Sequence, residues 1–274
     1  MGSKRLDGKR VVVTGASRGI GAAVARRAAA EGADVAIVAR TVDAADAYLP
    51  GTLGDTADQL RRFGGQVVVI QADLADERDR DRVVAEAEAG LGGPIDVLVN
   101  NAAVALYGTV ADYTFKRMRL MYELNCVAPL HLAQAVIPAM AERGEGWIVN
   151  VSSGTARHWQ GPPFQLGGTG TGTTVYGASK AALNRVSNGL AAELHGHGIR
   201  VNTVEPRAAV MSEGARDLVG DIVRPDQIES MEEMVEAILA LCDCPADHTG
   251  NTHISLDLID ELGLTVHSLD GAPM

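Results

Sequence analysis

A tyrosine and a lysine stand four residues apart in the segment Tyr176-Gly-Ala-Ser-Lys180. On an α-helix this spacing places both side chains on one face. A phenol is a poor acid at neutral pH because its unperturbed pKa is about 10. A fixed cation nearby favours the phenolate and lowers that pKa toward the range of a working acid or base. Tyr176 and Lys180 are therefore candidates for proton-transfer chemistry.

A glycine-rich turn near the N-terminus has the composition of a phosphate-binding loop. The segment Thr14-Gly-Ala-Ser-Arg-Gly-Ile-Gly21 follows a short apolar run and opens a helix-like stretch. Its glycines allow a tight turn and a close approach of a pyrophosphate to the backbone. The N-terminus of the following helix supplies free N–H groups and the positive end of the helix dipole. We therefore predict a dinucleotide site that includes Gly15, Ser17, Arg18, Gly19, Ile20 and Gly21.

The end of the second predicted strand indicates which dinucleotide binds. A ribose 2′-hydroxyl usually meets an acidic residue there, whereas a 2′-phosphate favours an arginine. The chain has Ala39-Arg40 at this point, and Arg18 in the glycine loop could fold toward the same phosphate. These two arginines predict NADP(H) as the cofactor, with NADPH preferred over NADH.

Short apolar runs alternate with helix-like stretches along the chain. Such buried-type strands separated by helices specify a parallel, doubly wound α/β sheet. Two stretches depart from this rhythm: residues 41–58 lengthen the connection after the second strand, and residues 161–174 are rich in Gly, Thr and Pro. The second stretch precedes Tyr176, so it is either a flexible surface loop or, as we favour, a substrate-facing loop. Strands are predicted at 10–13, 34–39, 67–71, 97–99, 147–151, 200–204 and 251–256, with helices at 20–31, 79–91, 116–142, 175–195 and 230–243.

Composition limits the classes of partner. The net charge of −11 disfavours nucleic acid, because phosphate binding needs a basic footprint. The three cysteines (Cys126, Cys242 and Cys244) form neither a disulfide framework nor a zinc pattern, and reduced thiols are typical of a cytosolic protein. The N-terminus has no secretory signal, and no apolar run reaches the ~18 residues that a membrane span needs. We therefore expect a soluble cytoplasmic protein without a metal, membrane or nucleic-acid partner.

With the glycine loop, Asn100-Asn-Ala-Ala103 and Tyr176-x-x-x-Lys180 in this order, the chain resembles the short-chain dehydrogenase/reductase family from about Lys9 to Gly250. The resemblance implies a Rossmann-like, doubly wound sheet of seven parallel strands with helices on both faces. A single oxidoreductase domain would then cover residues 1–274. The resemblance also implies hydride transfer between a nicotinamide and a carbonyl or alcohol, and a homodimer or homotetramer.

Matching the family's motifs residue by residue assigns roles to this site. Tyr176 matches the catalytic acid/base, and Lys180 the residue that lowers the tyrosine pKa and binds the nicotinamide ribose. Ser153, rather than Ser152, matches the serine that polarises the substrate. Asn125 matches the asparagine that helps to hold a proton-relay water. Further cofactor contacts are expected at Asp73, Leu74, Asn101, Val210 and Ser212.

Three of these residues have a plain structural alternative. Ser153 could end a strand, Asn125 could satisfy a carbonyl at a helix bend, and Asp73 could cap the next helix, a position that short polar side chains favour. For Tyr176 and Lys180 the alternative is an exposed pair on the surface of a helix.

The chain also departs from the family's pattern. The family's Asn-Asn-Ala-Gly ends in Ala103 here, and its Pro-Gly after the sixth strand is Pro206-Arg207. Ser153 and Tyr176 are 23 residues apart, a longer separation than is usual, because of the Gly/Thr-rich insert. The segment Leu49-Pro-Gly-Thr52 is similar to the branch with hydroxysteroid-dehydrogenase-like proteins. We expect a substrate loop at 154–174, a lid at 207–230 and a C-terminal tail at 257–274. The segment from Thr249 to Asp257 lacks the family's final Asp-Gly-Gly, so we expect the tail to pack differently from the family's at a subunit contact.

The sequence thus predicts an NADP(H)-dependent oxidoreductase with Tyr176 as acid/base. Trp159, Phe164 and Leu166 in the insert favour a small to medium hydrophobic carbonyl or alcohol as substrate. Two alternatives stay open, since a fold alone does not imply a reaction. One is a catalytically idle NADP(H) sensor or scaffold, and the other is an enzyme of the same fold with dehydratase or epimerase chemistry.

Overall fold

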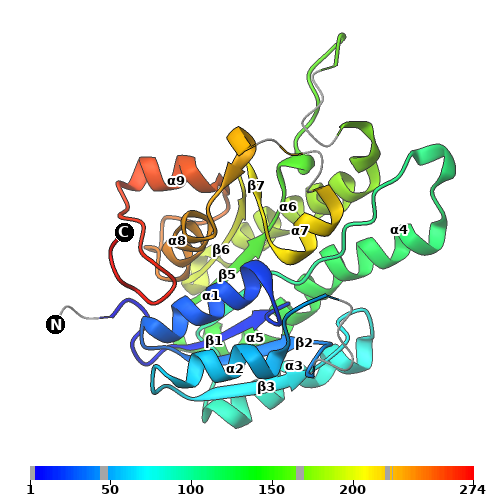
Figure 1. Ribbon diagram of the computed structural model, residues 1–274. Helices are drawn as coiled ribbons and strands as arrows, with labels where there is room; N and C mark the ends of the chain where they lie inside the picture. Colours follow the sequence, from blue (N-terminus) through cyan, green and yellow to red (C-terminus); the bar gives the residue numbers. More distant parts are fainter. Residues whose placement is uncertain (1–3, 44–48, 165–169, 220–222, 224) are drawn as a thin grey trace.

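Seven parallel strands form the central sheet, in the order β3-β2-β1-β4-β5-β6-β9 (Figure 1). The structure is a computed structural model that describes residues 4–43, 49–164, 170–219, 223 and 225–274. It confirms the predicted α/β class, the Rossmann-like seven-stranded sheet and the single domain. The strands are β1 (Arg10–Thr14), β2 (Asp34–Ala39), β3 (Val67–Gln71), β4 (Val97–Asn100), β5 (Gly146–Val151), β6 (Ile199–Glu205) and β9 (Thr252–Ile254).

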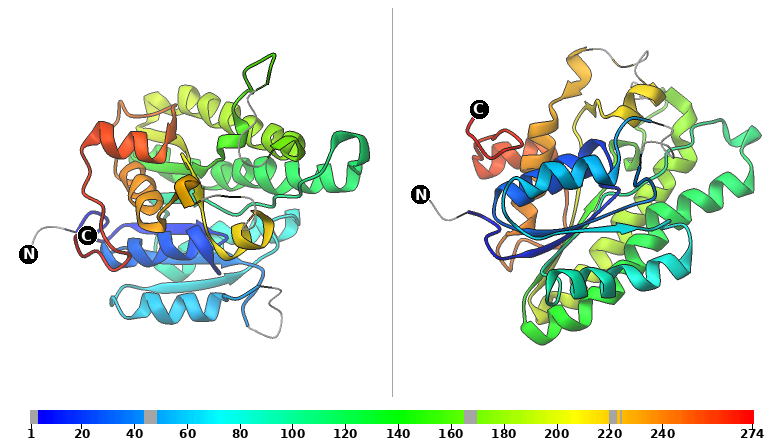
Figure 2. Two further views of the ribbon diagram at one scale, coloured as in Figure 1. Left: turned by 45° about the horizontal axis from the view of Figure 1, so that its top comes forward. Right: turned by 60° about the horizontal axis from the view of Figure 1, so that its bottom comes forward.

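Two layers of helices enclose the sheet (Figure 2). Side chains alternate between the two faces of a strand, so each face has its own core. Val11 and Val13 of β1 pack in one core, whereas Val12 packs in the other. Because both faces are covered, the central strands are apolar almost throughout. The first core lies under α1 (Gly19–Ala30), α2 (Leu53–Arg61), α8 (Met231–Cys242) and α9 (Ser255–Leu262), and the second under α3 (Glu77–Leu91), α5 (Ala128–Arg143) and α6 (Thr174–Leu194).

The strand order places a crevice at the carboxyl ends of β1 and β4. The chain winds from β1 outward to β2 and β3, then crosses back so that β4 pairs with the other side of β1. The connections that follow β1 and β4 therefore diverge, and ligands of open α/β sheets bind at such a switch point. The fold thus predicts where a dinucleotide would lie.

The predicted helix over 116–142 is built from three pieces. It comprises α4 (Phe115–Tyr122), a π turn over Glu123–Val127, and α5. A π turn inserts one extra residue per turn and often marks a functional site. Here it contains Asn125, a predicted site residue.

The stretch Phe115–Arg143 is also long and apolar enough, by length and composition, to cross a membrane. Its apolar window has a mean hydropathy of 1.4, and 39% of that window is buried inside the protein. The expectation that no stretch of the chain is long and apolar enough for a span was therefore wrong. Core helices of water-soluble proteins pass the same test, so one such helix carries little weight as a sign of a span.

Three elements differ from the sequence-based expectation. The 41–58 connection leads into α2, whose first turn is capped by Thr52, since its hydroxyl accepts a hydrogen bond from Asp55 N at 3.0 Å. The seventh strand is shorter than 251–256, because the chain turns into α9 at Ser255 and buries Leu258 on α8. The predicted lid at 207–230 contains α7 (Glu213–Val219) and a separate two-stranded sheet of β7 (Ala209–Val210) and β8 (Ile228–Glu229).

The C-terminal tail packs on its own chain. The His267 backbone N–H donates to Glu236 of α8 at 3.2 Å, and Arg26 of α1 forms an ion pair with Asp270 at 2.8 Å. Val266 and Leu269 add apolar contacts to the core under α1 and α8. These contacts hold the tail on its own chain, and the expected subunit contact of the tail stays a prediction.

Candidate functional site

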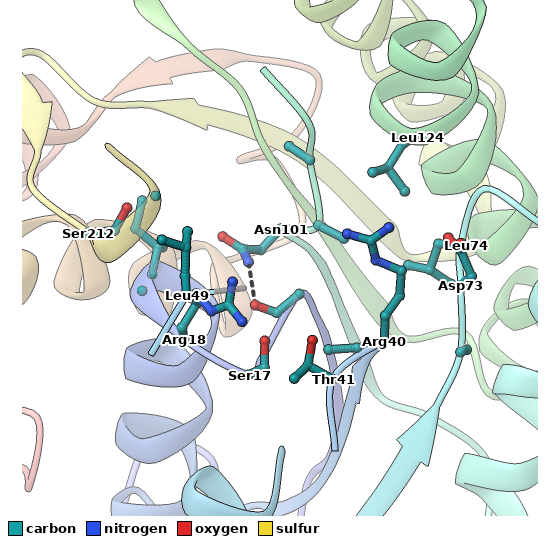
Figure 3. A pocket seen from close by; sticks show the side chains of 18 residues that line it. Ser17, Arg18, Arg40, Thr41, Leu49, Asp73, Leu74, Asn101, Leu124 and Ser212 are labelled. Atoms are coloured by element: carbon teal, nitrogen blue, oxygen red, sulfur yellow. Dashed lines mark hydrogen bonds between the residues drawn. The ribbon is translucent and has the colours of Figure 1, made fainter. Parts of the chain in front are cut away.

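A cavity of about 360 Å³ opens at the carboxyl ends of β1, β2, β3 and β4 (Figure 3). Ten of the fourteen residues predicted to bind the cofactor line it: Gly15, Ser17, Arg18, Gly19, Ile20, Arg40, Asp73, Leu74, Asn101 and Ser212. The other four are Gly21, Tyr176, Lys180 and Val210, which do not belong to the described lining. The wall also contains residues that the sequence did not single out for binding: Ala39, Thr41, Leu49, Ala72, Ala102, Ala103, Leu124 and Gly214.

The glycine loop closes the end of this cavity nearest to α1. Gly15 has φ +67°, a left-handed conformation that favours glycine. A β-carbon on Gly21 would lie 2.4 Å from the carbonyl oxygen of Gly15, so only glycine fits there. Helix α1 begins at Gly19 without a side-chain cap and without an acidic residue in its first turn. Its first N–H groups are thus available to an anion such as a pyrophosphate.

Asn101 joins the glycine loop to the end of β4. Its side-chain amide donates to the carbonyl oxygens of Thr14 at 2.9 Å and Gly15 at 3.3 Å. In return, the Thr14 hydroxyl accepts hydrogen bonds from the backbone N–H groups of Asn101 and Ala102, each at 3.0 Å. The side chain therefore fixes the cavity floor as well as lining it.

Two arginines lie on opposite sides of the cavity, with Ser17 and Thr41 between them (Figure 3). Arg18 donates to Gly51 O at 3.2 Å, and its Nε is buried without a hydrogen-bond partner among the described residues. Arg40 is exposed and forms no ion pair within the described chain. Both guanidinium groups could therefore take an anionic ligand.

Arg40 also borders a second cavity of about 330 Å³, next to the first. Its other lining residues are Gln71, Asp73, Asp79 and Arg82. Arg82 is a further cation that sequence reasoning missed, because the strand-tip rule considers only the end of β2. No motif marks an arginine inside the first turns of α3.

Ser153 and Tyr176 lie close to each other, outside the described lining of the cavity. Ser153 follows β5, and its hydroxyl opposes the other influences on the tyrosine pKa. Its neighbour Ser152 instead donates to Asn184 Oδ1 at 2.6 Å. Ser153, and not Ser152, therefore lies near the tyrosine, and its role toward a substrate stays a prediction.

Burial dominates the electrostatics of the tyrosine and lysine pair. Burial, together with the neighbouring phenol of Tyr107, raises the pKa of Tyr176 above its usual value. Burial lowers the pKa of Lys180 to about 8, although Cys126 opposes this shift. The ammonium donates to Val151 O at 2.7 Å. Lys180 is not among the groups that shift the pKa of Tyr176 in this structure. The expected lowering of that pKa by Lys180 therefore stays a prediction.

Asn125 lies fully buried in the π turn. Its side-chain amide donates to Val104 O at 2.9 Å and to the Ser179 hydroxyl at 3.0 Å, while its Oδ1 accepts from Val104 N at 2.9 Å. Both N–H donors are therefore in use. The side chain holds the segment after β4 against α6, and any contact with a relay water would have to use the remaining acceptor capacity or the backbone.

Tyr107 is a site residue that sequence reasoning missed. Its ring lies 5.6 Å, centroid to centroid, from that of Tyr176 at a tilt of 53°. The next residue, Gly108, donates from its backbone N–H to Gly172 O at 2.9 Å, which attaches the Gly/Thr-rich insert to this segment. The only sequence signal is an aromatic residue a few positions after Asn101.

The start of the predicted lid contacts the glycine loop. A β-carbon on Gly19 would lie 2.9 Å from the Ser212 β-carbon, so the two segments touch. Buried Glu229 accepts hydrogen bonds from the backbone of Arg207 and from the Ser255 hydroxyl, at 2.9 and 2.8 Å. Residues 220–222 and 224 of the lid, and 165–169 of the insert with the predicted Leu166, lie outside the described residues.

Among the described residues, no group of three or more His, Cys, Asp and Glu side chains could hold a metal ion. All three cysteines are free thiols, and Cys242 and Cys244 are buried.

The sequence model of the short chain dehydrogenases matches residues 9–218. The chain belongs to this family. Ketoacyl reductase HetN of Nostoc sp. strain PCC 7120 is 34% identical over 201 residues, which cover 73% of this chain and 63% of HetN. Hydroxysteroid dehydrogenase-like protein 2 of Danio rerio is 32% identical over 262 residues, or 95% of this chain and 60% of that protein. The chain thus spans less than two thirds of the length of these two relatives.

Solved structures of short-chain dehydrogenases share the fold. One from Mycobacterium thermoresistibile has a TM-score of 0.80 at 31% identity, and the match covers 94% of this chain and 89% of the other. L-sorbose reductase of Gluconobacter frateurii, solved with NADPH and L-sorbose, has a TM-score of 0.76 at 28% identity. The match covers 92% of this chain and 97% of the reductase. The uncapped α1, the close-packed glycines and the Arg18 Nε, which has no partner among the described residues, fit the phosphates of a nicotinamide cofactor.

Proposed function

We propose that the protein is an NADP(H)-dependent oxidoreductase that acts on a small to medium hydrophobic carbonyl or alcohol, with Tyr176 as the acid/base. The observation that carries the proposal is that the Ser153 hydroxyl lies close enough to the Tyr176 phenol to influence its pKa. Two neighbouring hydroxyls can both turn toward one substrate oxygen. Such fixed donors stabilise the negative charge that develops there during reduction.

In the reductive direction the bound nicotinamide supplies the hydride. Ser153 holds the substrate oxygen, and the Tyr176 phenol donates a proton to that oxygen as charge develops on it. The buried Lys180 places a positive charge at the end of β5, and this charge favours the phenolate that remains. The contacts of Asn125 keep the segment after β4 in place, so the chain's own residues supply position and electrostatics.

Three basic side chains support the preference for NADPH. Arg18 and Arg40 face the first cavity from opposite sides, and Arg40 and Arg82 line the second. A 2′-phosphate at the boundary of the two cavities would meet Arg40 from either side. Asp73 and Leu74 would then contact the adenine, and Ser212 with Val210 the nicotinamide end.

The cofactor preference is tested with Arg40→Asp. The carboxylate repels a 2′-phosphate and accepts a hydrogen bond from a 2′-hydroxyl, so NADPH affinity should fall and NADH affinity should rise. Fluorescence titration gives both dissociation constants for the wild type and the variant. The matched control is Arg61→Asp, an exposed arginine on α2 that lines neither cavity. An unchanged NADPH/NADH ratio in Arg40→Asp would remove Arg40 as the phosphate reader.

The reaction is tested with Tyr176→Phe across a panel of carbonyl substrates. We expect the variant to lose nearly all turnover and to keep its NADPH affinity, because the phenol acts on the substrate. Tyr113→Phe, which removes a hydroxyl bonded to Leu106 O at 2.6 Å, serves as the control. Net NADPH consumption by the wild type separates the alternatives: an epimerase recycles the cofactor, and an idle sensor leaves it untouched. Near-normal turnover by Tyr176→Phe would sink the assignment.

The remaining features of the proposal concern the surroundings of the site. Residues 154–174 act as the substrate loop and 207–230 as the lid, and Trp159 and Phe164 contribute apolar surface. Phe115 is 72% exposed on α4, and Val127 is also exposed, which favours a homodimer or homotetramer formed through this helix. We place the protein in the cytoplasm, with a small-molecule substrate and without nucleic-acid or membrane partners. Light scattering coupled to gel filtration measures the oligomeric state.

A further inference from the structure

Arg80 is a buried arginine outside the described cavity lining. The residue is 4% exposed and lies in the first turn of α3. Its Nη1 donates to Leu74 O at 2.8 Å, its Nη2 pairs with Glu123 at 2.7 Å, and its Nε donates to His131 Nδ1 at 3.1 Å. All three nitrogens of the guanidinium are therefore in use.

The three partners belong to three separate segments. Leu74 lies in the connection from β3 to α3, Glu123 begins the π turn, and His131 lies in α5. His131 Nδ1 accepts from Arg80, so its proton resides on Nε2, which faces Asp81 at 3.2 Å. The imidazole is thus fixed from both sides.

Two of these three segments each contribute a leucine to the wall of the cofactor cavity. Leu74 lines the cofactor cavity, and so does Leu124, the residue after Glu123. Figure 3 shows the two leucines on the same side of the cavity, on different elements. The next residue of the turn, Asn125, holds Val104 and Ser179. Arg80 therefore spans from the cavity wall to the turn that supports the catalytic helix α6.

Packing alone does not require a charge at this position. The neighbouring buried residues of α3, Val83 and Val84, fill the same core with apolar side chains. A buried guanidinium with one partly exposed carboxylate partner is costly unless its hydrogen bonds are well placed. The planar fork of arginine defines distances and angles between its acceptors, which an aliphatic side chain cannot do.

We propose that Arg80 is a positioning residue that holds the Leu74 wall of the cofactor cavity against the Asn125 turn. Cofactor affinity and turnover then both depend on a side chain that touches neither cofactor nor substrate. This inference rests on the proposed cofactor cavity, but not on the identity of the carbonyl substrate.

The test compares Arg80→Met with Arg143→Met. Arg143 makes a similar pair of contacts, to Ile95 O at 2.7 Å and Asp96 at 3.4 Å, before the start of β4 and outside the cavity lining. Both variants lose stability, so melting temperatures are recorded and NADPH dissociation constants are measured by fluorescence well below them. We expect Arg80→Met to weaken NADPH binding by about fivefold or more, the range of a typical coupling between sites. Arg143→Met should bind as the wild type does.

Two further variants keep the test decisive if Arg80→Met does not fold. Arg80→Lys retains the charge but not the fork, and Glu123→Gln retains the shape but not the charge, so both should bind NADPH with intermediate affinity. Hydrogen exchange at residues 123–127 should quicken in each. Folded Arg80 variants that bind NADPH within about twofold of the wild type, a difference too small for such coupling, would overturn the inference. A wild type that binds only NADH would overturn the proposed cofactor, and the same comparison is then made with NADH.

Discussion

Lys180 donates a hydrogen bond from Nζ to the carbonyl oxygen of Val151 at 2.7 Å. The bond links α6 to the last residue of β5, and Ser152 and Ser153 follow directly. The lysine thus anchors the helix that carries Tyr176 to the strand that carries Ser153. With the side chain only 2% exposed, this anchor comes at a cost, because the ammonium has lost most of its water.

That cost predicts a pH dependence of stability. The folded-state pKa of Lys180 is about 8, below the ordinary 10.5, so the unfolded chain binds more protons between these two values. The burial penalty is therefore fully present below pH 8 and is relieved as the pH rises toward 10.5. Urea unfolding at pH 7 and pH 10 should show the wild type gaining up to roughly 3 kcal/mol relative to Lys180→Met. A pH-independent difference between the two proteins would contradict the lowered pKa.

Substitutions of Tyr107 should lower activity to different degrees, depending on whether the aromatic ring is kept. The ring contact of Tyr107 restricts the Tyr176 phenol, the proposed acid/base, and an aromatic pair contributes about 0.5–1.5 kcal/mol beyond its buried area. We expect Tyr107→Ala to lower kcat/KM by about two- to tenfold, the equivalent of that energy, while Tyr107→Phe keeps most of it. Steady-state kinetics on one substrate, with NADPH saturating, makes the comparison. Equal losses in both variants would assign the effect to the Tyr107 hydroxyl instead of the ring.

Replacing Asn125 by a residue of the same shape but without its N–H donors should lower the stability of the fold. In Asn125→Asp the Oδ1 contact with Val104 N is retained, but the two donors to Val104 O and Ser179 are lost. Unsatisfied buried partners cost about 1–3 kcal/mol each, so the free energy of unfolding should fall by at least that amount. Asn188→Asp, which loses one exposed bond to Gly250 O, is the control and should change little. A near-neutral Asn125→Asp would show that water replaces these contacts.

The sequence predicts the sheet and the glycine loop well because both depend on local signals. Apolar runs bounded by glycine or polar residues define β1 to β6, and a turn such as Gly15 to Gly21 needs glycine for steric reasons. Motif matching likewise depends on short segments, and the roles that it gives Ser153 and Tyr176 stay predictions. These features are encoded within a few residues of one another.

Other features depend on contacts between distant segments and have no local signal. Tyr107 reaches Tyr176 only because the segment after β4 folds back over α6, and Arg80 reaches Glu123 across 43 positions. Helix α9 replaces the end of the expected last strand because Leu258 and Ile259 find a buried surface on α8. Apolar residues in a short segment suit a strand or a helix equally well, and tertiary packing decides between them.

The contacts of the C-terminal tail lead to a prediction about the free energy of unfolding. Arg27 of α1 and Glu236 of α8 form a buried ion pair at 2.9 Å, with exposures of 1% and 2%, and Glu236 also accepts from Arg5 and from the His267 backbone. Glu236→Gln leaves Arg27 with Glu31 as its remaining carboxylate partner among the described residues, so the free energy of unfolding should fall by about 3–5 kcal/mol. Urea unfolding measures this loss, and limited proteolysis should show earlier cleavage between 264 and 274.

The matched control is Asp270→Asn, which breaks the exposed ion pair with Arg26 on the same tail. An exposed pair contributes at most about 1 kcal/mol, so this variant should unfold close to the wild type. If Glu236→Gln behaved like Asp270→Asn, the buried pair would not hold the tail, and the apolar contacts of Val266 and Leu269 would have to do so alone.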